Sequence, residues 1–134
     1  MNSTLLVTGS VVAVLAALLH LVIFYFESVA WGTPAIWKRF GVRTQDDADT
    51  IKPMALNQGY YNLFLAVGAL VGVALLLWSD VQVAGYAVAL FALFSMVAAA
   101  GVLIVSNPRL ARAAFTQGTL PLVASVLLLV AAYL

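Results

Sequence analysis

The chain has 134 residues, of which 65% are hydrophobic and 8% are charged, and it contains no cysteine. A soluble domain is about half apolar and about a quarter charged, so this chain has too little polar surface to cover a water-soluble globule. The composition therefore indicates a membrane protein. It excludes disulfides and, with six scattered basic residues and a net charge of +1, it excludes nucleic acid as a main partner.

Four apolar runs divide the chain, and each is longer than the roughly 20 residues that a spanning helix needs. The first is too long for the core of a signal peptide and has no basic residue before it, so we interpret it as a span. Helices are expected because an open sheet in lipid leaves backbone groups unpaired. The sequence predicts an all-α membrane protein, a single four-transmembrane-helix antiparallel bundle over residues 1–134. Its approximate spans are 5–31, 54–78, 83–105 and 111–134.

The connection between the first two spans has helix signals of its own. Thr33 is suited to the N-cap, Pro34 to the first helical position, and Gly41 to the end of a short helix. Trp31 and Trp37 are typical of residues that anchor a chain at the membrane interface. We predict a short interfacial helix here, lying in the headgroup layer.

The start of the second span combines a start signal with a breaking signal. Thr44 and Asp47, three residues apart, form a capping-box type of helix start. Pro53 follows, and it is expected to disrupt the helix about one turn before the hydrocarbon.

Basic residues indicate the orientation of the bundle. Four lie in the first connection and two lie by the third, and none lies at either terminus or in the 79–82 hairpin. The positive-inside rule therefore places the long connection in the cytoplasm and both termini outside. The six are Lys38, Arg39, Arg43, Lys52, Arg109 and Arg112.

A few polar side chains interrupt the spans, where such groups are costly. Counted at 1.5 Å per residue from the cytoplasmic boundaries, Glu27, Gln58 and Gln117 lie about 6–8 Å deep. His20 and Asn62 lie about 12–17 Å deep on the same scale. Three helices thus carry polar groups at two matching levels of the cytoplasmic half.

These levels suggest a binding pocket with polar and aromatic walls between the first, second and fourth spans. Pro121 lacks the N–H that would bond to the carbonyl of Gln117, which leaves an additional acceptor at this depth. The candidate ligand-binding residues are His20, Phe24, Glu27, Asn57, Gln58, Tyr61, Asn62 and Gln117.

Structural roles compete with this interpretation. Gln58, Asn62 and Gln117 can hold helices together by hydrogen bonds of about 0.6–2 kcal/mol each. Glu27 can reach water or pair with Lys38 or Arg39, and a neutral His20 can bond to Asn62. One histidine and no cysteine cannot build a common zinc site, and no phosphate loop or nucleophile motif is present. We therefore assign no catalytic residue, metal or cofactor.

Three segments resemble a small bacterial membrane-protein family, the one called domain of unknown function 1304. The first runs from His20 through Phe24 and Glu27 to Trp31, and the second is the Asn-Gln-Gly-Tyr-Tyr-Asn block that starts at Asn57. The third is Gln117-Gly118 followed by a proline. The resemblance covers nearly the whole chain and implies a four-helix protein of the inner membrane, without implying an activity or a cofactor.

The leading functional hypothesis is a membrane-embedded protein that binds a small amphipathic or lipid-like molecule. Glu27 would recognise a polar or cationic head, and His20 and Asn62 would satisfy deeper groups. A proton-coupled exporter that uses Glu27 and a structural or accessory subunit are the alternatives, and an enzyme that uses His20 and Glu27 as acid and base is less favoured. The expected partners are membrane lipid and the ligand, with a homo-oligomer or a membrane-protein partner left open.

Overall fold

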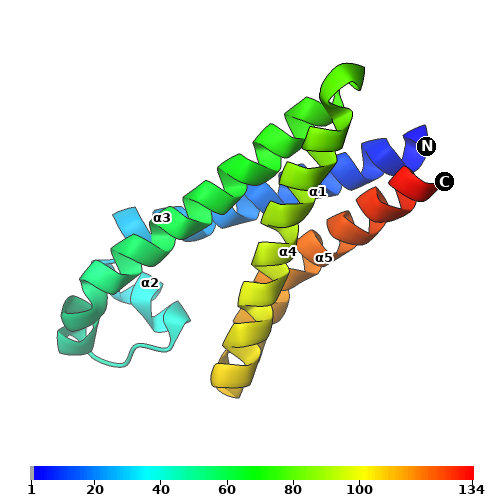
Figure 1. The fold of residues 1–134 in the computed structure, drawn as a ribbon. Coiled ribbons are helices and arrows are strands. Elements are labelled where there is room, and N and C mark those ends of the chain that lie inside the picture. Colours follow the sequence, from blue (N-terminus) through cyan, green and yellow to red (C-terminus); the bar gives the residue numbers. More distant parts are fainter. Residues whose placement is uncertain (1) are drawn as a thin grey trace.

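The computed structural model describes residues 2–134, and that range contains helices and no strand (Figure 1). The long helices are α1 (Ser3–Phe24), α3 (Gln45–Leu76), α4 (Gln82–Ser106) and α5 (Ala111–Tyr133). The short elements are η1 (Tyr25–Val29), α2 (Pro34–Trp37), η2 (Lys38–Phe40), η3 (Ser79–Val81) and η4 (Pro108–Leu110). Taken with their short extensions, four helices are long and apolar enough to cross a membrane, as predicted.

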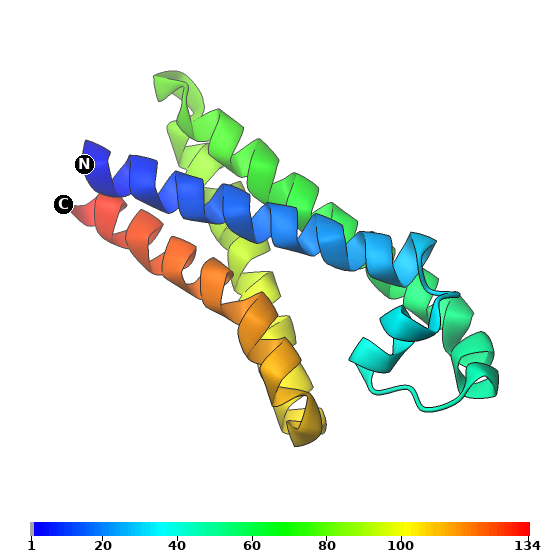
Figure 2. The ribbon, with the colours of Figure 1, turned by 180° about the vertical axis from the view of Figure 1, so that it is seen from behind.

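The long helices form a ring in which each contacts two others. α1 packs against α3 and α5, and α4 packs against the same two helices. Both termini lie at one end, and toward the other end the α1 and α3 pair diverges from the α4 and α5 pair (Figures 1 and 2). α5 bends partway along its length (Figure 2), and Pro121 lies inside it. Because proline removes a helix hydrogen bond, it accounts for this bend.

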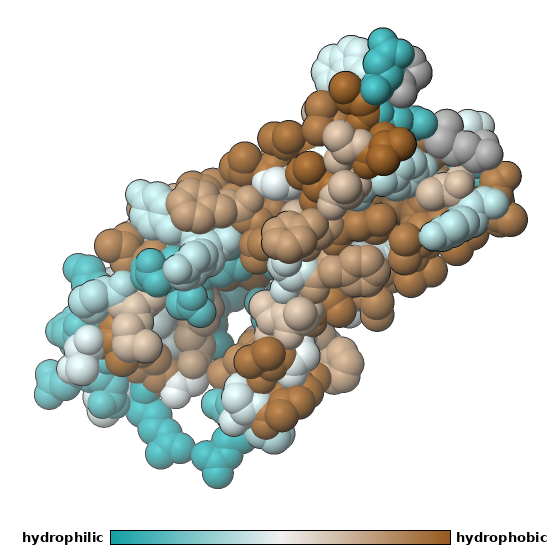
Figure 3. Space-filling view, viewed as in Figure 1, coloured by the Kyte–Doolittle hydropathy of each residue, from teal (hydrophilic) through white to brown (hydrophobic). Residues whose placement is uncertain are grey.

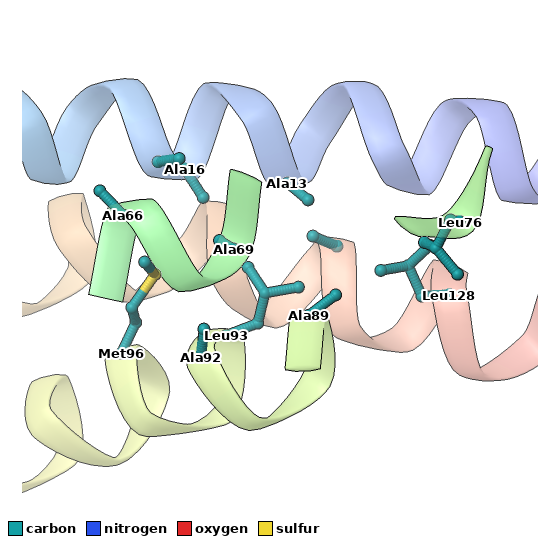
Figure 4. Packing of buried hydrophobic residues seen from close by; sticks show 12 residues of the cluster. Ala13, Ala16, Ala66, Ala69, Leu76, Ala89, Ala92, Leu93, Met96 and Leu128 are labelled. Atoms are coloured by element: carbon teal, nitrogen blue, oxygen red, sulfur yellow. The ribbon is translucent and has the colours of Figure 1, made fainter. Parts of the chain in front are cut away.

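Small residues form most of the core. Figure 4 shows Ala16, Ala66 and Ala92 between the helices, with Leu93 and Met96 filling the space between them. At Gly72 an added Cβ would collide with the backbone of Ala89, so α3 and α4 approach closely only because this residue is glycine.

The outer surface of the helices carries the larger apolar side chains. Val7, Val83 and Phe91 are 62%, 85% and 75% exposed, while the buried positions are largely alanine and glycine. In water, exposing the large apolar side chains and burying the small ones would lose much of the hydrophobic stabilisation of the fold. In lipid, by contrast, helices associate through small residues, and the large side chains face the acyl chains. Figure 3 shows the apolar surface extending along the long helices, with hydrophilic residues gathered around α2 and the start of α3.

The segment between α1 and α3 has a small core of its own. Trp31 and Trp37 are 5% and 3% exposed and pack with Ala48 and Ala55. The indole N–H of Trp31 donates a 2.9 Å hydrogen bond to the carbonyl of Ala48. The two rings that we expect to anchor the chain at the membrane interface are thus buried against α3 within this segment. Gly41 ends the short helix with φ +81°, as predicted.

α3 begins nine residues before the predicted start of the second span, at Gln45 instead of 54. The capping box is confirmed, since the Thr44 hydroxyl accepts a 3.1 Å hydrogen bond from the Asp47 N–H and donates one to its carboxylate. The expected disruption at Pro53 is wrong, because α3 continues through it. The cap and the hydrogen bond from Trp31 stabilise the turns that precede the proline.

Candidate functional site

The last turn of the first span is a π-helix, which the sequence analysis did not predict. The N–H of Ala30 donates a 2.9 Å hydrogen bond to the carbonyl of Tyr25, five residues earlier. A π-helical turn is rare and is frequently found at functional sites, because it rotates the side chains that follow it. Here the π-helix η1 contains Glu27 and Ser28.

Glu27 is joined to α3 by a side-chain hydrogen bond. The Nδ2 of Asn62 donates to the Oε2 of Glu27 over 2.9 Å, and the carboxylate is partly buried. The same Nδ2 lies 3.2 Å from the carbonyl oxygen of Gln58. A hydrogen bond to a carboxylate is stronger than one between neutral groups, so it fixes the position of Glu27 between the two helices.

The neighbouring residue, Ser28, makes a second bridge between η1 and α3. Its hydroxyl donates a 3.1 Å hydrogen bond to the carbonyl of Leu56. This close approach depends on Gly59, where an added Cβ would collide with the Ser28 hydroxyl and lie 3.1 Å from the Cβ of Glu27. Gly59 was noted in the sequence as part of the family motif only, and the structure gives it a physical role.

A cleft of about 400 Å³ opens beside these two bridges. Its lining combines one carboxylate, one ammonium group and apolar side chains, which is the mixture that amphipathic ligands require. Glu27 comes from η1 and Lys52 comes from the first third of α3. The lining residues are Glu27, Ser28, Val29, Trp31, Gly32, Lys52, Pro53 and Leu56.

His20 lies apart from this cleft. It is 2% exposed, and its Nδ1 is 2.9 Å from the carbonyl oxygen of Ala16 on the same helix. The expected hydrogen bond between His20 and Asn62 is not among those of the described residues, since Asn62 donates to Glu27 instead. His20 therefore contributes to the packing between α1 and its neighbours.

The basic residues considered as alternative partners of Glu27 lie elsewhere. The Lys38 ammonium group is 5.5 Å from the centre of the Trp37 ring, and the Arg39 guanidinium is 5.5 Å from the centre of the Phe26 ring. Both distances fit cation–π contacts. Glu27 therefore has Asn62 as its hydrogen-bond partner, while Lys38 and Arg39 contact aromatic rings.

The remaining candidate residues are distributed over α1, α3 and α5. Phe24 packs edge-on against Tyr60, with 5.4 Å between ring centres. Asn57, Gln58 and Tyr61 are exposed on α3. Gln117 is half-buried on α5, which packs against α1 and α4. Of the predicted group, the structure brings Glu27 and Asn62 into contact, and it adds Ser28, Trp31 and Lys52, which the sequence analysis did not select.

Metal-binding groups are not clustered in the described part of the chain. Among residues 2–134, no group of three or more histidine, aspartate or glutamate side chains could hold a metal ion. The polar groups of the site are the partly buried carboxylate of Glu27, the amide of Asn62, the hydroxyl of Ser28 and the ammonium group of Lys52.

Comparison with known proteins identifies the family. A family model described as "Protein of unknown function (DUF1304)" matches residues 14–129. The chain belongs to this family of membrane-like helical proteins, in agreement with the resemblance seen in its sequence motifs. Neither a curated protein nor a solved structure matches the chain.

Proposed function

We propose that this protein is an integral inner-membrane protein that binds a small amphipathic molecule in the cleft beside Glu27. The observation that supports the proposal best is the hydrogen bond from Asn62, because it holds a carboxylate in a fixed position on the wall of a cleft of about 400 Å³. A cationic head fits this carboxylate, and Trp31 and Leu56 offer apolar contacts to the adjoining part of the ligand.

The proposed topology is an antiparallel bundle whose long connection faces the cytoplasm and whose termini face outward. The positions of the six basic residues support it, since all of them lie between η1 and the first third of α3 or around η4. α2 then lies in the headgroup layer, and the cleft opens near the inner leaflet. The hydrophilic surface around α2 and the start of α3 is consistent with this placement (Figure 3).

The apolar tail of the ligand is proposed to enter the opening between the two helix pairs. Gly9 of α1 lies against Leu128 of α5. Eleven residues along each helix from this contact bring His20 level with Gln117, which lies four residues before Pro121. We propose that Gln117 and Phe24 line the inner end of the opening, while the buried His20 packs against the neighbouring helices.

A structural or accessory role is the second candidate. Asn62 with Glu27 and Ser28 with Leu56 join η1 to α3 at two successive levels. Such bonds stabilise membrane helices even when no ligand is present. Substitutions at these residues would then change stability without changing the binding of any small molecule.

Binding can be measured through Trp31, which lines the cleft. In a protein with Trp37→Phe and Trp78→Phe, dodecylamine is the probe, and its titration in detergent is expected to give a saturable change in Trp31 emission. Glu27→Gln is expected to weaken binding about tenfold or more, equivalent to about 1.4 kcal/mol. Asp46→Asn, which makes the same carboxylate-to-amide change at an exposed position of α3 outside the cleft lining, is the matched control and should bind as the parent does. Equal titrations of the parent and Glu27→Gln would contradict the proposal.

A further inference from the structure

The cleft contains two opposite charges, and they come from different depths. Glu27 bonds to Asn62, whereas Lys52 lies ten residues before Asn62 on the same helix. Ten residues correspond to about 15 Å along a helix axis. The carboxylate is therefore on the inner side of the cleft and the ammonium group is on the side of α2 and the connection.

The contacts of η1 with α3 support this order. Ser28 bonds to Leu56, and Trp31 bonds to Ala48, so each step along the end of the first span moves toward the start of α3. Lys52 lies between these two levels on α3. The charges are thus arranged along the helix axis, with Glu27 nearer the apolar part of the bundle.

The Glu27 carboxylate has capacity for another partner. Within the described residues it accepts one side-chain hydrogen bond, through Oε2, whereas an ionised carboxylate can accept several. Lys52 is exposed, and an ammonium group offers three donors. Both residues that line the cleft therefore have hydrogen-bonding capacity left for a ligand group with one positive and one negative charge.

We infer that the cleft selects a zwitterionic amphiphile whose ammonium group is next to the apolar chain and whose anionic group is outermost. The inference rests on the proposed function and specifies its ligand. Phospholipids with an ethanolamine head carry the opposite order, because their phosphate is next to the chain and their ammonium group is outermost. The order of charges, and not net charge alone, then determines which amphiphile binds.

Three probes with the same chain length separate these possibilities. N-dodecylglycine has the inferred order of charges, dodecylphosphoethanolamine has the reverse order, and dodecylamine has only the positive charge. Each is titrated against the full-length protein that keeps Trp31 as its single tryptophan. We expect N-dodecylglycine to bind at least tenfold more tightly than either of the other probes.

Variants of Lys52 identify the origin of this preference. Lys52→Gln is expected to remove the advantage of N-dodecylglycine over dodecylamine, and Lys52→Arg is expected to keep it. The side chain is exposed, so both variants are expected to fold, and thermal unfolding of each is the check. An advantage that survives Lys52→Gln would overturn the inference.

The two proposals fail in different ways. If dodecylamine binds through Glu27 but N-dodecylglycine binds no better, the inferred charge order is wrong and the proposed function stands. If dodecylphosphoethanolamine binds most tightly, the order is reversed and the inference is overturned. If none of the three probes gives saturable binding, both the inference and the proposed function are wrong.

Discussion

The amide of Asn62 donates a 2.9 Å hydrogen bond to the carboxylate of Glu27, and this contact joins α3 to the π-helical end of the first span. Thirty-five residues separate the two in sequence. The contact holds the only glutamate of the chain at a fixed position beside a cleft, so we expect the stability of this end of the bundle and the proposed ligand binding to depend on it.

Breaking this contact is expected to destabilise the protein. Asn62→Leu removes the donor, and the free energy of unfolding should fall by about 0.6–2 kcal/mol, the usual range for such bonds between membrane helices. A double-mutant cycle with Glu27→Met in detergent should show a coupling of similar size. Asn57→Leu, at an exposed position of α3, is the control and should leave stability within about 0.5 kcal/mol. Additive effects of the two site substitutions would show that the pair contributes no coupling energy.

Gly59→Ala tests the close approach of η1 to α3. The added methyl group collides with Ser28 and crowds Glu27, so thermal unfolding should show a loss of about 1–3 kcal/mol. Gly101→Ala is a matched control within α4, because no atom lies within 4 Å of its added Cβ. It should raise stability by up to about 1 kcal/mol, since alanine favours a helix over glycine. Similar changes in both variants would argue against the packing at Gly59.

Pro121→Ala is expected to straighten α5 and narrow the opening between the helix pairs. The substitution restores the N–H that can bond to the carbonyl of Gln117. Because the chain has no native cysteine, spin labels can be placed at Val29→Cys and Arg112→Cys, both at exposed positions. Pulsed electron–electron double resonance in lipid nanodiscs should then give a shorter distance between the two labels in the Pro121→Ala background.

A label pair at the closed end supplies the control for that experiment. The distance between Val7→Cys and Tyr133→Cys should not change, since both lie at the end where the termini meet (Figure 1). An unchanged distance at the open end would show that the divergence of the helices does not depend on Pro121.

The orientation of the bundle predicts which cysteines a membrane-impermeant maleimide can reach. Arg43→Cys and Arg109→Cys should be modified only when the cytoplasmic face is open to the reagent. Val83→Cys, which is highly exposed next to the opposite hairpin, should be modified in intact cells. Modification of Arg43→Cys in intact cells would reverse the proposed topology.

The spanning helices could be predicted from the sequence because length and hydropathy determine them directly. The positions of the connections followed from local signals, such as Gly41 in the left-handed region and the cap at Thr44. The cap at Thr44 also indicates the early start of α3, and Pro53 does not prevent the helix from continuing. A proline breaks a helix less readily when the preceding turns are capped and held by a tertiary contact, here from Trp31.

Part of the site was present in the sequence as helical spacing. Lys52, Leu56, Gly59 and Asn62 are four, three and three residues apart, so they share one face of any helix that starts at Thr44. Helical spacing could not predict the π-helix. The hydrogen bonds of Ser28 and Glu27 that accompany it are made to α3, and local sequence does not show such tertiary contacts. Depth counting from the membrane boundaries brought Gln117 to the level of Glu27, whereas counting from the contact of Gly9 with Leu128 brings it level with His20.

Binding in the cleft beside Glu27 is tested most directly by mapping where an amphiphile binds. A dodecylamine analogue with a photoreactive diazirine in its chain is irradiated with the protein in nanodiscs, and the labelled peptides are sequenced by mass spectrometry. We expect labelling concentrated on the cleft segments 27–32 and 52–56, and a loss of that labelling in Glu27→Gln. Labelling spread evenly over the lipid-facing residues of all four helices, and unchanged in Glu27→Gln, would contradict it.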